Sequence, residues 1–270
     1  MTKTDAYELL LELIHGKATS ARITERELND YFVPEGLLKG QNYLERLASS
    51  LQNSGMMHNS IRFNESEERY NHIKNVLCDF DAQKVLSKYR DWKELYYALT
   101  NNGEEDKGVR KDADDKRTNW GKYAKGLYCG IDFLENNGGQ QQIEQLCATP
   151  ANEAELNKKI KEIKQIEKSI YGLGFALTCD WLKECGCTWL AKPDIHIKIV
   201  CSAIASEQNA EMTDVDIVKF VFLFAQEVQQ KYPNVTAYQL DKIIWLICTG
   251  NFYLQKDKIG RDTILARLGE

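Results

Sequence analysis

The chain has 270 residues, of which 43% are hydrophobic and 28% are charged. This composition is typical of a folded globular protein with one large domain or two small ones, and it excludes a wholly disordered chain, a collagen-like repeat and a fibrous coiled coil. The formal net charge of −5 argues mildly against a nucleic-acid partner, because such partners usually need a basic face.

Neither a membrane span nor an export signal is expected. The N-terminal apolar cluster at 9–11 is short and is flanked by Glu8 and Glu12, whereas a membrane helix needs roughly 18 unbroken apolar residues. The eight cysteines are scattered without a CxxC pair, so we expect reduced thiols in a cytoplasmic protein, with no metal site and no iron–sulfur cluster.

Apolar residues at helical spacing dominate the chain from its start. Tyr7, Leu10, Leu11 and Ile14 form the first stripe, with Asp5 as its expected cap. Strand-like alternation is hard to find, so the pattern predicts an all-α protein of around ten helices. Further helices are expected over 25–32, 38–51, 65–77, 82–99, 120–135, 140–147, 151–168, 175–185, 196–206, 213–231 and 236–249.

The segment 101–118 is polar and has almost no apolar residues, which is typical of a loop or linker. We therefore predict two regions: an N-terminal helical region, 1–118, which ends in this loop, and a core with C-terminal helices, 119–270.

A Gly-Leu-Gly sequence, Gly172 to Gly174, directly follows the lysine-rich helix expected at 151–168. Two glycines two positions apart favour a tight turn between helices, with Leu173 packing back onto them. The N–H groups that open the next helix form a natural phosphate site. Taken alone, the motif is more typical of a simple helix cap and turn than of a phosphate site.

Asp194 lies twenty residues after Gly174, follows Pro193 and precedes an apolar helix. The proline fixes the entry to that helix, and the aspartate is an expected N-cap. A cap is also a rigid mount for a functional carboxylate, so the structural and the functional interpretation are compatible.

Together these residues resemble the helix-hairpin-helix DNA glycosylases, and among them the 8-oxoguanine-glycosylase branch. That family joins a Gly-x-Gly hairpin to a Pro-Val-Asp-x-His-Val type of segment about twenty residues later. A closing helix with an Asp before an apolar-Trp run adds to the resemblance, which covers about 120–250. The matching residues are Gly172, Gly174, Pro193, Asp194, His196 and Ile197, followed by Asp241 and Trp245.

The resemblance implies two helical subdomains with an active-site cleft between them, double-stranded DNA with a damaged or modified base as the partner, and no cofactor. It implies base flipping and hydrolysis of the N-glycosidic bond with Asp194 as the catalytic carboxylate. Members that also nick the strand carry a lysine where this chain has Ala176. We therefore expect a monofunctional, monomeric enzyme, and Lys168 is the alternative nucleophile.

DNA contacts are expected from the hairpin, at Lys168, Tyr171, Gly172, Leu173 and Gly174. The helix that enters the hairpin and the window 107–126 are net basic, so the net charge averages over unlike regions and no longer counts against DNA. Aromatic residues expected to stack a flipped base are Trp92, Trp120, Tyr123 and Phe252.

Two other functions stay open at this stage. One is a non-catalytic helix-hairpin-helix module that binds DNA in repair or phage defence. The other is an all-α protein-interaction domain in which the motif is accidental. The excised base also stays open among oxidised guanine, alkylated purines and bulky modified phage cytosines.

Overall fold

The computed structural model describes residues 2–20, 22–40, 42–100, 112–115, 117–205, 212–249 and 261–269. Every regular element in these ranges is a helix, which confirms the all-α prediction. None of these helices is long and apolar enough to cross a membrane.

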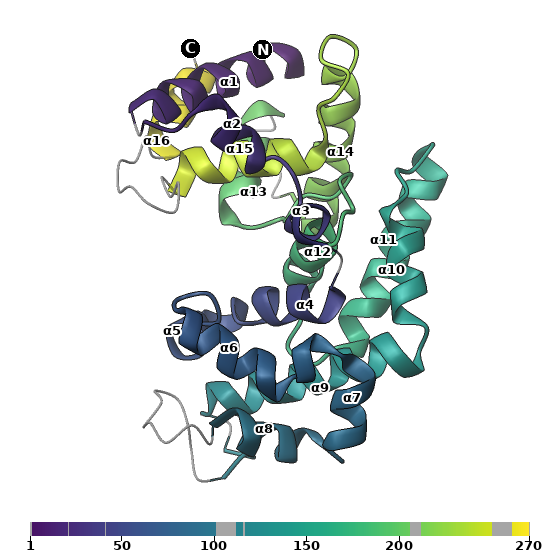
Figure 1. Ribbon diagram of the computed structural model, residues 1–270. Helices are drawn as coiled ribbons and strands as arrows, with labels where there is room; N and C mark the ends of the chain where they lie inside the picture. The colour runs from purple at the N-terminus through teal and green to yellow at the C-terminus, as the bar shows by residue number, and fades with distance from the viewer. Residues whose placement is uncertain are drawn as a thin grey trace.

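The helices form two lobes around two hydrophobic cores (Figure 1). The central lobe is built around the first core, which contains Trp120, Tyr123 and Trp181, all fully buried. Its α-helices are α4 (Tyr43–Leu51), α5 (His58–Ile61), α6 (Glu67–Val76), α7 (Ala82–Lys88), α8 (Trp92–Thr100), α9 (Asn119–Asn136), α10 (Gly139–Cys147), α11 (Glu153–Ser169) and α12 (Phe175–Glu184), with short 3-10 turns at Ser54–Met56 and Cys78–Phe80.

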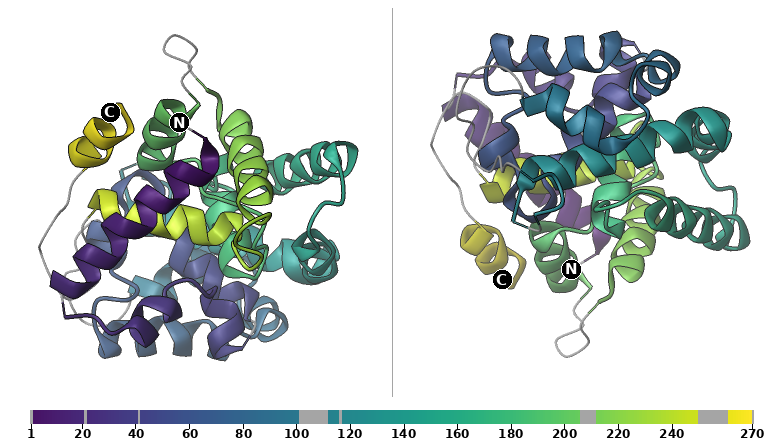
Figure 2. Two further views of the ribbon diagram at one scale, coloured as in Figure 1. Left: turned by 90° about the horizontal axis from the view of Figure 1, so that it is seen from above. Right: turned by 90° about the horizontal axis from the view of Figure 1, so that it is seen from below.

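The terminal lobe joins the first and last parts of the chain around the second core. Its helix α1 (Lys3–Ser20) lies across α15 (Ala237–Thr249), as seen from above in Figure 2, and the first apolar stripe at Leu10 and Ile14 is fully buried there. The other helices of this lobe are α2 (Glu25–Asp30), α13 (Ile195–Ile204) and α16 (Arg261–Gly269).

Two helices connect the lobes. α14 (Asp214–Val228) places Phe222 in the core of the central lobe and Val221 in that of the terminal lobe. The short α3 (Glu35–Lys39) lies against the end of α12, where a Cβ on Gly36 would come within 2.6 Å of the Glu184 carbonyl oxygen. The expected division was into 1–118 and 119–270. The two cores divide the chain differently, because the second core combines residues from both ends of the chain.

Several helices begin where the sequence offers a cap. Thr213 forms a capping box with Asp216, as its position before α14 predicts. The first helix begins earlier than expected, because the hydroxyl of Thr2, rather than Asp5, accepts the capping hydrogen bond from the Asp5 N–H at 3.1 Å.

Two of the predicted helices are each broken in two. The expected helix at 38–51 is interrupted at Gly40, whose φ of 87° is outside the helical range, and Asn42 caps α4. The expected helix at 82–99 ends at Lys88, and Asp91 starts α8 by accepting from the Lys93 and Glu94 N–H groups at 2.8 and 3.0 Å. In both segments the apolar spacing continues across the break, which a glycine with positive φ creates in the first and a capping aspartate in the second.

Candidate functional site

The Gly-Leu-Gly segment forms a tight turn between α11 and α12. Gly172 has a φ of 77°, in the region that favours glycine, and the Leu173 side chain is only 2% exposed. The Ser54 hydroxyl donates to the Gly172 carbonyl at 2.9 Å, which ties the turn to the segment after α4. The predicted turn and its leucine plug are therefore confirmed.

The two glycines have different roles. Gly174 has an ordinary φ of −71° and stands at the N-cap of α12 without a capping side chain. A Cβ at this position would meet no atom within 4 Å. The glycine leaves the first N–H groups of α12 without a side-chain cap, which is the arrangement that suits a phosphate oxygen.

Lysines flank the turn on two helices. Lys125 on α9 lies with its Nζ 4.3 Å from the centre of the exposed Tyr171 ring, and Lys164 on α11 lies 6.0 Å from that of Phe175. Within the described residues neither lysine forms an ion pair, and the same holds for Lys122, Lys161 and Lys168. We call these five lysines the hairpin basic face.

Asp194 is the N-cap of α13, as predicted. Its Oδ1 accepts from the N–H groups of His196 at 2.9 Å and Ile197 at 3.2 Å. The second oxygen, Oδ2, has no hydrogen-bond partner in the described part of the chain. The carboxylate is thus held firmly through one oxygen, while the other is free for a ligand.

The segment that carries Asp194 is anchored to a buried ion pair. The Lys192 N–H donates to Asp241 Oδ1 at 2.7 Å, and the Lys183 ammonium on α12 is paired with Asp241 Oδ2. Burial raises the pKa of the Asp241 carboxyl and outweighs the opposing effect of Lys183, and the nearby Asp194 charge raises it further.

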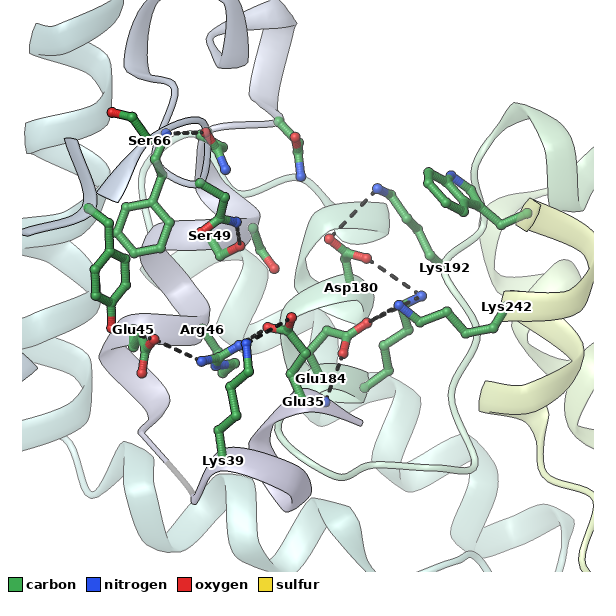
Figure 3. A pocket seen from close by; sticks show the side chains of 18 of the residues that line it. Glu35, Lys39, Glu45, Arg46, Ser49, Ser66, Asp180, Glu184, Lys192 and Lys242 are labelled. Atoms are coloured by element: carbon green, nitrogen blue, oxygen red, sulfur yellow. Dashed lines mark hydrogen bonds and ion pairs between the residues drawn. The ribbon is translucent and has the colours of Figure 1, made fainter. Parts of the chain in front are cut away.

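A cleft of about 740 Å³ opens between the lobes. Its walls are formed by α3, α4 and α6 with the segments between them on one side, and by α12, Lys192 and α15 on the other (Figure 3). Asp194 does not line it, but Lys192, two residues earlier, does. The basic lining residues are Lys39, Arg46, Lys183, Lys192 and Lys242, and the acidic ones are Glu35, Glu45, Glu67, Asp180 and Glu184.

Ion pairs connect the cleft to α12, the helix that begins at the hairpin. Asp180 on α12 lies 3.7 Å from the Lys192 Nζ and 3.6 Å from the Lys183 Nζ, and Lys242 on α15 lies 2.8 Å from Glu184 (Figure 3). Burial raises the pKa of Asp180, but Lys192, Lys183 and Lys242 outweigh burial and hold it below its usual value. α12 therefore begins at the hairpin and reaches the cleft one to three turns later.

Three of the aromatic residues predicted to form a base pocket, Trp92, Trp120 and Tyr123, do not line this cleft. Trp120 and Tyr123 are fully buried in the central core, and the Tyr123 hydroxyl donates to the Ala48 carbonyl at 3.0 Å. Stacking on either ring would require the core to open. Trp92 is half-buried with Lys125 5.9 Å from its ring centre, on the side of the hairpin basic face. Phe252 lies outside the described residues.

The remaining predicted residues are placed as follows. Ala176 is half-buried in the first turn of α12, and Lys168 is exposed near the end of α11. Burial opposes a raised pKa for Lys183, but Asp241, Asp180 and Glu184 together raise it, so this ammonium stays protonated. The described residues contain no group of three or more His, Cys, Asp or Glu side chains arranged as a metal site.

The sequence pattern missed the cleft residues Asp180, Lys183 and Lys192. Each lies in a segment that was singled out for another reason, but their contacts join segments that are distant in sequence. Lys183 and Asp241, for example, are 58 positions apart. The one available signal is an aspartate within the apolar stretch of α15, because a buried carboxylate requires a partner.

Comparisons with known proteins identify no relative. No family model matches the chain, and neither the curated proteins nor the solved structures contain a significant match.

Proposed function

We propose that this protein is a DNA glycosylase that flips out a damaged or modified nucleotide and hydrolyses its N-glycosidic bond with the help of Asp194. The observation that carries the proposal is that one set of contacts connects the hairpin, the cleft and Asp194. The helix that starts at the hairpin, α12, lines the cleft and pairs through Asp180 with Lys192, which stands two residues before Asp194.

DNA binding is assigned to the hairpin and its basic face. The N–H groups that open α12 suit a phosphate oxygen, and the lysines on α9 and α11 suit the neighbouring phosphates. This arrangement confines the contact to one side of a protein whose net charge is −5. Binding should therefore weaken steeply as salt is added.

Asp194 is assigned to the chemical step. When the base leaves, positive charge develops on the sugar, and a fixed carboxylate stabilises that charge in the transition state. The free Oδ2 faces no competing donor in the described residues. The same carboxylate is suited to accept a proton from the water that attacks the sugar.

The absence of strand cleavage is the expected consequence of Ala176 and of the protonated ammonium of Lys183. A lysine forms a Schiff base with the sugar only as a neutral amine. The carboxylates around Lys183 raise its pKa and hold the proton on it. The product is therefore an abasic site in an intact strand.

The test measures abasic sites in duplexes that carry single damaged or modified bases. Asp194→Asn keeps an oxygen that caps α13 but removes the negative charge, so we expect loss of base release with DNA affinity retained. The matched control is Asp81→Asn, at the N-cap of α7, which should leave base release unchanged. DNA binding without base release from any duplex would instead identify a non-catalytic DNA-binding module.

A further inference from the structure

The cleft carries many charges but no net charge. Its lining contains five acidic and five basic side chains, together with six neutral polar ones and the aromatic residues Phe63, Tyr70 and Trp245. Nine of these ten charged groups form ion pairs with one another, as in the pairs Lys242–Glu184 and Lys192–Asp180.

This lining disfavours three kinds of ligand. A phosphate or carboxylate would be repelled by as many acidic groups as there are basic groups to attract it. A cation would likewise be repelled by as many basic groups as there are acidic groups to attract it. An alkyl group that filled the space would strip water from ionised side chains and give no hydrogen bonds in return, which is costly. The favoured ligand is uncharged and polar.

Hydrogen-bonding capacity narrows the choice further. The carboxylates of Asp180 and Glu184 only accept, whereas the groups of Arg46, Lys192 and Lys242 only donate. A hydroxyl or amide group both donates and accepts, so several such groups on one ligand can be satisfied between the two sets. A ligand with acceptors alone can satisfy only the basic half of the lining.

The size of the cleft exceeds that of a plain base. Guanine has roughly eleven heavy atoms, and even at the roughly 30 Å³ that a water molecule claims in the liquid it would fill about 330 Å³. The cleft measures about 740 Å³. The remaining space is suited to a substituent about as large as the base itself.

On the basis of the proposed function, we propose that the cleft takes a nucleobase with a bulky, uncharged substituent rich in hydroxyl or amide groups. Small oxidised bases and alkylated purines are then poor ligands. The flat base has aromatic partners in the half-buried Tyr70 and Trp245, and its substituent lies between the acidic and basic walls.

The first experiment measures the affinity of the Asp194→Asn protein for otherwise identical duplexes. One arm carries cytosine with a glucosyloxymethyl group on C5, and a second carries adenine with a carbamoylmethyl group on N6. Comparison duplexes carry N6-benzyladenine, 8-oxoguanine or no modification. We expect at least one of the first two to bind ten or more times more tightly than all three comparisons, and the arm that does so identifies hydroxyl or amide chemistry.

Ser49 provides a variant that tests whether the cleft is responsible. Its half-buried side chain on α4 lines the cleft and accepts from Asn64 Nδ2 at 3.1 Å. Ser49→Leu should remove most of the preference for the bulky polar base and leave affinity for unmodified DNA unchanged. The matched control is Ser87→Leu, at an exposed position on α7, which should keep the preference.

The outcomes separate this inference from the proposed function. Equal affinity for all five duplexes, or tighter binding of the benzyl duplex, overturns the inference whether or not the wild type releases a base. A preference that survives Ser49→Leu overturns the role of the cleft. A preference lost in Ser49→Leu, in a protein that releases no base, supports the cleft ligand and contradicts the glycosylase.

Discussion

Asp241 connects the catalytic candidate to the interior of the protein. It accepts from the Lys192 N–H, pairs with Lys183, and both members of the ion pair are nearly inaccessible to solvent, at 2% and 4% exposure. Breaking a buried pair leaves an uncompensated charge in the interior, which typically costs about 3–5 kcal/mol. This pair therefore holds the segment before Asp194 in place.

Lys183→Ala should accordingly lower the free energy of unfolding by about 3–5 kcal/mol, as measured by urea denaturation. The control is Lys198→Ala, which removes a lysine paired with Asp214 at a third exposed or more and should cost less than about 1 kcal/mol. Equal losses in the two variants would contradict the anchoring role of the buried pair.

Individual residues differ in how far the sequence could predict them. Asp194 was predicted as a cap because caps depend on three or four neighbouring residues, and it is confirmed. Trp120 and Tyr123 were expected in a pocket but lie in the core, because their surroundings are set by segments such as α4 and α6, which are distant in sequence.

The hairpin shows how two glycines in one motif serve different needs. Gly172→Ala should cost roughly 1–2 kcal/mol, because a side chain disfavours its positive φ. Gly174→Ala should change stability by less than about 0.5 kcal/mol, since its φ is ordinary and the space around it is open. Thermal denaturation of both variants tests this difference, and similar losses at the two positions would contradict it.

Two free cysteines, one at the end of α10 and one in the loop after α12, lie in contact. The Sγ atoms of Cys147 and Cys187 are 2.9 Å apart. The hydrogen bond from Cys187 lowers the pKa of Cys147 more than burial raises it, and the Lys159 charge lowers it further. This pair makes Cys147 the more reactive thiol, with a second thiol in place to react next.

Hydrogen peroxide should therefore oxidise Cys147 to a sulfenic acid, which condenses with the Cys187 thiol to a disulfide and releases water. Mass spectrometry of the intact protein should show the loss of two hydrogen atoms, reversible with dithiothreitol. Cys187→Ser should block the cross-link. A protein that reached the sulfenic acid but never the disulfide would contradict this expectation.

Helix breaks set the limit of prediction for the elements. The helical spacing predicted most helices to within a few residues, since apolar periodicity reports which face is buried. It failed at Gly40 and at Asp91, where a glycine with positive φ ends one helix and a local cap starts another while the apolar pattern continues. A continuous stripe indicates burial, not an unbroken backbone.

The molecule as a whole should lose stability in acid, because the carboxylates of the cleft become protonated. The lysines around Asp180 and Glu184 lower the pKa of both carboxyls despite burial, so the stability they contribute is present above their unfolded pKa values of about 4 and is lost as pH falls below them. Asp241 has a raised pKa and acts in the opposite sense. A comparison with Asp180→Asn, which leaves Asp241 intact, therefore isolates the effect.

The free energy of unfolding of the wild type should exceed that of Asp180→Asn at neutral pH, and the difference should shrink as pH falls from about 5 to about 3. Urea denaturation at a series of pH values measures this. A difference that is constant over the range would show that folding does not lower the pKa of Asp180.

The arrangement of the lobes was the least predictable property. Helix content follows from local pattern and is confirmed, whereas the packing of α1 beside α15 joins segments more than 200 residues apart. The sequence division at the polar loop does not reveal this arrangement. It also gave no sign that charged side chains would line the cleft in place of the predicted Trp92, Trp120 and Tyr123.

The central claim is that the protein releases a base from DNA through Asp194. The most direct measurement is mass spectrometry of the free bases that wild type and Asp194→Asn release from a mixed pool of damaged and modified DNAs. We predict that one class of modified base appears with the wild type and is lost with Asp194→Asn, while the strands stay uncut. Release of the same base by both proteins, or by neither, would contradict the account.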